Sequence, residues 1–205
     1  MLKHEQRTQR RHHQSARLRA DAAADLRLIR EAMDHSARFT DVSGVGMMLI
    51  GLTAVIAAWL AATAEADAAW LAIWGFELLL AVTIGAVAIA LKARLSGSEM
   101  LATPVRRFLR GMIPPLVAGA ALAAFCAKAG LVGNLPGVLL LLYGTALITG
   151  GAHSLSLVRF QGVCFMVLGA LTLFVPAEFG DAAMALGFGG LHIAFGAVIA
   201  RRYGG

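Results

Sequence analysis

Residues 70–91 read WLAIWGFELLLAVTIGAVAIAL, an apolar stretch in which Glu77 is the one ionisable side chain. A helix rises about 1.5 Å per residue, so a stretch of this length crosses a hydrocarbon core of about 30 Å. A membrane barrel is excluded because its strands alternate between apolar and polar residues, and an open sheet edge cannot be satisfied in lipid. The stretch therefore predicts a transmembrane helix.

Further apolar runs of similar length surround this one along the chain. Hydrophobic residues make up 59% of the sequence and charged residues 15%, whereas soluble domains carry about 25% charged residues. We therefore predict an all-α integral membrane bundle of six helices over residues 41–202. Its predicted spans are 44–62, 70–91, 111–127, 136–152, 160–176 and 182–200.

The charges between the runs predict an orientation in the membrane. Of the 18 Lys and Arg residues, 17 lie at one set of ends of the runs, and nine of these precede the first run. The opposite ends hold Lys128 and four acidic residues, Glu65, Asp67, Glu178 and Asp181. Because cytoplasmic loops are enriched in Lys and Arg, we expect both termini in the cytoplasm of a bacterium, with the spans in its inner membrane. The net charge of +6 is thereby explained without a nucleic-acid partner.

The segment before the first run divides into two parts. Residues 1–15 have no apolar periodicity and are predicted to be a disordered basic tail. Residues 16–40 are predicted to form a cytoplasmic amphipathic helix, because apolar residues recur at spacings of three and four. Such a helix lies in the membrane interface or docks on a partner; the alternative is a solvated helix below the bundle. Residues 16–38 are expected to bind anionic lipid headgroups or a protein partner. The candidate contact residues are Arg17, Arg19, Arg27, Arg30 and Arg38.

The six runs also suggest an internal repeat. An Arg-Phe pair precedes each odd-numbered run, at residues 38–39, 107–108 and 159–160. The stretch Gly44–Gly51 aligns with Gly162–Gly169. This pattern predicts three related helical hairpins around a pseudo-symmetric core.

The glycine rhythm of residues 162–176, which ends on Pro176, resembles that of the HdeD-like acid-resistance membrane proteins. The resemblance covers about residues 40–202 and does not include the basic N-terminal segment. Runs one and three also lack the proline that ends run five. The resemblance implies a six-helix inner-membrane protein linked to stress response, without a defined catalytic site.

Two ionisable residues, Glu77 and His192, lie deep in the predicted spans. Buried ionisable groups in a membrane are costly and often functional, so one hypothesis is an intramembrane pair that passes protons or binds a cation. The other hypothesis is that both are neutral and structural. A haem between His153 and His192 is disfavoured, because the two histidines are predicted to lie at different depths.

The sequence contains no phosphate loop, nucleophile elbow or metalloprotease helix motif. We therefore expect no enzyme activity, no cofactor and no metal. The sequence is compatible with either a monomer or an oligomer. The predicted function is a non-catalytic, regulatory, stress-related or assembly role. The alternative is a small proton or cation transporter or channel that uses Glu77 and His192.

Overall fold

The computed structural model describes residues 26, 28, 43–95 and 103–203. The chain forms two compact units, residues 1–39 and residues 40–205. In the first unit only Leu26 and Leu28 are described, and both are helical and exposed. The predicted tail and the predicted amphipathic helix, with all five of its candidate arginines, therefore lie outside the described residues.

The second unit is helical throughout its described residues and contains no strand there. Its long helices are α2 (Gly44–Ala61), α3 (Asp67–Leu95), α4 (Thr103–Ala129), α5 (Leu135–Gly150) and α6 (Ser156–Thr172). The last helical run comprises α7 (Gly180–Met184), the π-helix η4 (Ala185–Leu191) and α8 (His192–Tyr203). Short 3-10 turns lie at three bends: η1 (Val132–Asn134), η2 (Gly151–His153) and η3 (Ala177–Phe179). The predicted all-α class is confirmed.

Most of these helices have the length and composition of membrane spans. Five helical stretches within residues 43–95 and 103–203 are long and apolar enough to cross a membrane, and α6 is an apolar helix of 17 residues. Large apolar side chains such as Phe76, Leu79 and Val82 of α3 point out of the bundle. Such a surface suits lipid as its solvent, so the chain has the character of a multi-pass membrane protein.

The helices α3 and α4 are longer than the predicted spans. The run 70–91 lies within α3, which continues to Leu95, and the run 111–127 lies within α4, which begins at Thr103. The added residues include Lys92, Arg94 and Arg106. A helix can continue through polar residues after its apolar part ends. The apolar run therefore predicts which part of the helix lies in the hydrocarbon, and it does not predict where the helix ends.

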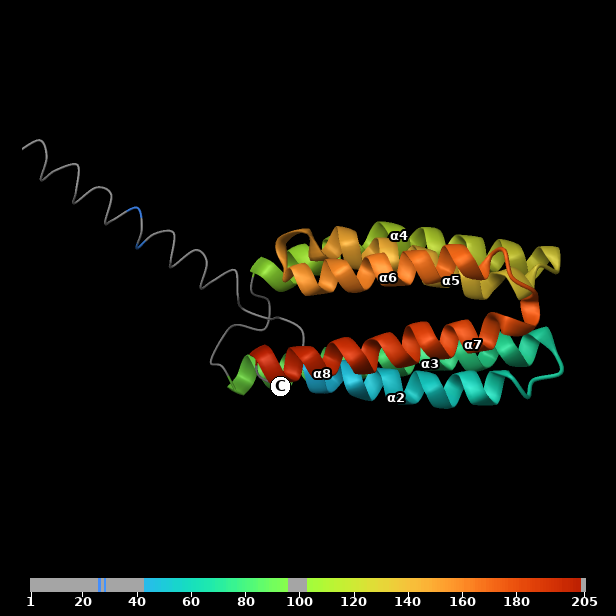
Figure 1. Cartoon of the computed structure of the whole chain (residues 1–205), viewed down its shortest axis with the longest axis horizontal. Coiled ribbons are helices and arrows are strands. Elements are labelled where there is room, and N and C mark those ends of the chain that lie inside the picture. The colour runs from blue at the N-terminus through green and yellow to red at the C-terminus, as the bar shows by residue number, and fades with distance from the viewer. Residues whose placement is uncertain (1–25, 27, 29–42, 96–102, 204–205) are drawn as a thin grey trace, which may run out of the picture. The chain divides into compact units, whose positions relative to one another are not determined.

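The described helices form two layers of three (Figure 1). In one layer α2 lies between α3 and α8, and in the other α5 lies between α4 and α6. One continuous apolar core joins the layers and includes Ala58 of α2, Trp74 of α3, Leu140 of α5 and Phe165 of α6. The arms of the third predicted hairpin, α6 and α8, belong to different layers. The three-hairpin repeat stays a prediction.

Within each layer, glycines allow two backbones to touch. A Cβ at Gly51 of α2 would lie 2.7 Å from the carbonyl oxygen of Gly189, and a Cβ at Gly144 of α5 would lie 2.6 Å from that of Gly162. The same contact recurs seven residues away in both helix pairs, between Gly44 and Gly196 and between Gly137 and Gly169. Seven residues are about two helical turns, so one helix face carries both contacts. Small residues in such positions are what hold helices together in lipid.

Candidate functional site

The most buried polar group of the helical core that has hydrogen-bond partners is the His192 side chain, at the junction of η4 and α8. It is 3% exposed. Its Nδ1 lies 2.9 Å from the carbonyl oxygen of Phe188, and its Nε2 lies 2.8 Å from the hydroxyl of Tyr143 on α5. A carbonyl oxygen only accepts, so Nδ1 donates, and in the neutral ring Nε2 accepts from the Tyr143 hydroxyl. Both ring nitrogens of His192 are therefore used, one within its own helical run and one across the two layers.

Aromatic rings surround the imidazole. The ring centroids of Phe165 and Tyr143 lie 5.4 and 5.5 Å from that of His192, and Phe188 stacks on it at 6.2 Å. Phe165 and Tyr143 are themselves 4.9 Å apart, edge to face. These rings come from α5, α6 and η4, so three segments of the chain converge on His192. The arrangement leaves the imidazole in apolar surroundings, where its two hydrogen bonds are strong and costly to lose.

Glu77 on α3 is 6% exposed and is bonded to α2. The Thr53 hydroxyl lies 2.8 Å from Glu77 Oε1 and 2.9 Å from the carbonyl oxygen of Ile50. A hydroxyl has only one hydrogen to donate. The Thr53 hydroxyl therefore shares its single hydrogen between the Glu77 carboxyl and the Ile50 carbonyl oxygen. This hydrogen bond ties the buried carboxyl of α3 to α2.

Glu77 and His192 lie at neighbouring levels of the bundle in separate hydrogen-bonded groups. The rings of Trp74 and Phe188 are 6.1 Å apart, and Glu77 and His192 come three and four residues after these two on helices that run in the same direction. No hydrogen bond or ion pair joins Glu77 to His192 within the described residues. Their action as a functional pair stays a prediction.

The sequence analysis did not predict three further polar side chains as parts of this region, namely Tyr143, Thr53 and Gln161. Tyr143 and Thr53 are the partners of the two ionisable residues, and both are half-buried. Gln161 on α6 is fully buried, and neither its Nε2 nor its Oε1 has a hydrogen-bond partner. Gln161 could have been predicted as a buried polar group, because it is a strongly polar side chain within the predicted span 160–176.

The side of the bundle opposite to the basic helix ends contains a polar tie between α3 and α7. The Trp70 indole donates a hydrogen bond of 2.8 Å to Asp181 Oδ1, and Trp70 also packs against Trp74, with centroids 6.1 Å apart. An amphipathic ring at a helix end with a polar partner is typical of a membrane boundary. This contact closes the described core at that end.

Nothing in the described part of the chain assembles a metal centre. Within residues 43–95 and 103–203 there is no group of three His, Cys, Asp or Glu side chains that could hold an ion. Cys126 is buried and Cys164 half-buried, and both are free thiols. His153 lies in the turn η2, directly after the end of α5.

Comparison with known proteins finds no matching family model, no matching curated protein and no matching solved structure. The resemblance to the HdeD-like proteins therefore rests on the glycine and proline rhythm of residues 162–176 and stays a prediction. The function has to be argued from the chemistry of the described residues.

Proposed function

We propose that this chain is a non-catalytic membrane protein with a regulatory, stress-related or assembly role. In this proposal it crosses a bacterial inner membrane six times, with both termini in the cytoplasm. The packed bundle is a platform, and the basic segment 16–38 is the part that engages anionic lipid headgroups or a protein partner.

The distribution of charge over the described helices supports the orientation. The ends of α3 and α8 and the starts of α4 and α6 carry basic residues and no acidic residue in the described ranges: Lys92, Arg94, Arg106, Arg107, Arg110, Arg159, Arg201 and Arg202. The opposite ends carry Lys128 with four acidic residues. Six crossings bring all the basic ends to one side, as the preference of Lys and Arg for the cytoplasm requires.

A single observation carries the non-transporting role, namely that the two deep ionisable groups are hydrogen-bonded locally. Glu77 is bonded within the α2–α3 pair, and His192 is bonded to Tyr143 and Phe188 inside a cluster of rings. Ion and proton paths need polar groups that line a water-filled passage. Groups that already use their hydrogen-bonding capacity in a packed core stabilise a fold instead.

The alternative is a small proton or cation transporter or channel built on Glu77 and His192. Its support is that the contact between Trp74 and Phe188 puts both ionisable residues at neighbouring levels on parallel segments. A carboxyl and an imidazole at one level can exchange a proton through a single intervening group. This reading requires the ring cluster to open during a transport cycle.

Proton flux into liposomes that contain the purified full chain separates the two functions. For the platform we expect wild type, Glu77→Gln and His192→Gln all to match empty liposomes. A dye that reports internal pH gives the rate, and a potassium gradient with an ionophore gives the driving force. Flux in wild type that disappears in both variants would overturn the platform and establish the transporter.

Engagement of lipid by the basic segment is tested in nanodiscs that contain the full chain. We expect tryptic cleavage within residues 16–38 to be slower in discs with phosphatidylglycerol than in purely zwitterionic discs, because anionic lipid attracts clustered arginines. Substituting Gln for Arg17, Arg19 and Arg38 leaves Arg27 and Arg30 as cleavage sites and should remove the difference. Equal cleavage of wild type in both discs would contradict lipid engagement and leave a protein partner as the target.

A further inference from the structure

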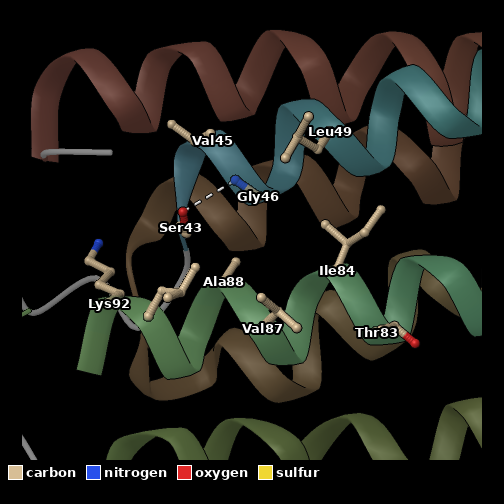
Figure 2. Close-up of a pocket in the computed structure, with 10 residues that line it drawn as sticks. Ser43, Val45, Gly46, Leu49, Thr83, Ile84, Val87, Ala88 and Lys92 are labelled. Carbon is tan, nitrogen blue, oxygen red and sulfur yellow. Dashed lines mark hydrogen bonds between the residues drawn. The ribbon is translucent and has the colours of Figure 1, made fainter. Parts of the chain in front are cut away.

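A groove separates α2 and α3 at the basic end of the bundle (Figure 2). Its volume is about 580 Å³, within the roughly 300–1,000 Å³ of small-ligand sites. Val45 and Leu49 of α2 and Ile84 and Val87 of α3 line its sides. The helices approach most closely at Gly46, where a Cβ would lie 2.6 Å from the Ala88 Cβ.

The lining is apolar apart from three polar side chains, Ser43, Thr83 and Lys92. Ser43 accepts a hydrogen bond of 3.2 Å from the Gly46 N–H, and Thr83 donates one of 2.8 Å to the Leu79 carbonyl. The third, Lys92, places its ammonium group at the same end of the groove as Ser43 (Figure 2). The groove thus has hydrocarbon walls and one cationic end.

The length of the groove matches one leaflet. From Thr83 to Lys92 the lining follows α3 for nine residues, or about 13 Å, which is close to half of a hydrocarbon core of about 30 Å. An apolar groove of this length suits a hydrocarbon tail from one leaflet.

The charge at the open end favours an anionic headgroup. Arg94 lies two residues beyond Lys92 and is exposed, and the other described residues at this end of the helices include no acidic side chain. Lysine side chains at such a boundary extend to the headgroup level. We propose that the groove between α2 and α3 binds one anionic phospholipid from the adjacent leaflet, with an acyl chain along Leu49, Ile84 and Val87 and the phosphate at Lys92. This site is independent of the platform and of transport.

Native mass spectrometry of the detergent-solubilised full chain, supplied with equimolar phosphatidylglycerol and phosphatidylethanolamine, tests this site. We expect wild type to retain one phosphatidylglycerol preferentially. Val87→Trp fills the groove from a half-exposed position and should lower retention at least tenfold. Leu49→Trp, from the opposite wall, should do the same. The matched control is Leu79→Trp, which adds the same ring to an exposed position of α3 outside the groove and should retain the lipid.

The cationic end has its own pair of variants. Lys92→Gln should keep a bound lipid but lose the preference for phosphatidylglycerol over phosphatidylethanolamine. Arg201→Gln removes one exposed cation from the same side, at the end of α8, and should keep that preference. Equal retention in Val87→Trp, Leu49→Trp and Leu79→Trp would overturn the groove as the site, and an unchanged preference in Lys92→Gln would overturn the anionic headgroup.

Discussion

The contacts within a layer of the bundle differ in kind from the contacts between the two layers. Within a layer, α5 and α6 touch backbone to backbone, as the pair Gly144 and Gly162 shows, and α2 and η4 do the same at Gly51 and Gly189. Between the layers, large rings such as Phe165 and Phe188 fill the space, at a centroid separation of 5.3 Å.

The difference shows how a protein without a strong hydrophobic driving force between helices organises itself. Lipid tails are as apolar as leucine, so helices associate through close packing and polar contacts. Glycine contacts bring the helix backbones of each layer close together. The hydrogen bond between Tyr143 and His192 crosses from one layer to the other, so polar chemistry is expected in this space.

The largest loss of stability is expected from a substitution at a glycine where two helix backbones touch. Gly144→Leu places a side chain 2.6 Å from the Gly162 carbonyl oxygen and 2.7 Å from the Met166 amide nitrogen. Neither backbone atom can move without separating α5 from α6, so the cost should exceed the roughly 1–3 kcal/mol of ordinary overpacking. We expect no monodisperse protein by size-exclusion chromatography. Gly75→Leu, where nothing lies within 4 Å, should remain monodisperse; equal loss in both would mean that the close contact is not what matters.

A smaller effect is expected from removing one ring between the layers. Phe165 is 0% exposed, so Phe165→Ala should lower the free energy of unfolding by about 3–5 kcal/mol. Steric trapping in bicelles measures this quantity. Phe174→Ala, at a ring that is 90% exposed, should change it little. A Phe165→Ala variant as stable as Phe174→Ala would contradict the proposed role of the rings in joining the layers.

The polar contact across the layers should contribute less than the ring. Tyr143→Phe keeps the ring but leaves Nε2 of His192 without its partner, which should cost about 1–3 kcal/mol. In a His192→Phe background the same substitution should cost less, because no buried acceptor is then orphaned. A double-mutant cycle on the free energy of unfolding measures this coupling. A coupling of zero would mean that the two side chains do not interact.

The smallest expected change in the free energy of unfolding is an increase, from replacing Gln161. Gln161 buries two amide atoms without partners, so Gln161→Leu should raise the free energy of unfolding by about 1 kcal/mol. The contrast with Tyr143→Phe distinguishes an unpaired from a paired polar group in the same core. Destabilisation by Gln161→Leu would show instead that the amide is hydrogen-bonded in the membrane.

Much of the fold can be predicted from the sequence, and less of the site. The run of residues 70–91 predicts the central part of α3 because apolar length alone decides whether a helix crosses a membrane. Glu77 and His192 stand out because ionisable groups are rare in such runs. Their partners Thr53 and Tyr143 could not be predicted. A hydroxyl in an apolar helix bonds its own backbone as readily as a distant side chain, as Thr83 and Thr145 do here.

The sequence by itself determines that the chain is helical, that its helices suit a membrane, and which of their ends are basic. These properties follow from apolar length and charge, which are local. Only the tertiary structure decides that α6 packs on α5 while α8 packs on α2, and that His192 faces Tyr143 while Glu77 faces Thr53. The physical reason is that a helix in lipid is apolar on every side. Hydrophobic periodicity therefore does not indicate which face of a helix packs against a neighbour. The packing partners are decided by which helix faces fit closely together at their glycines.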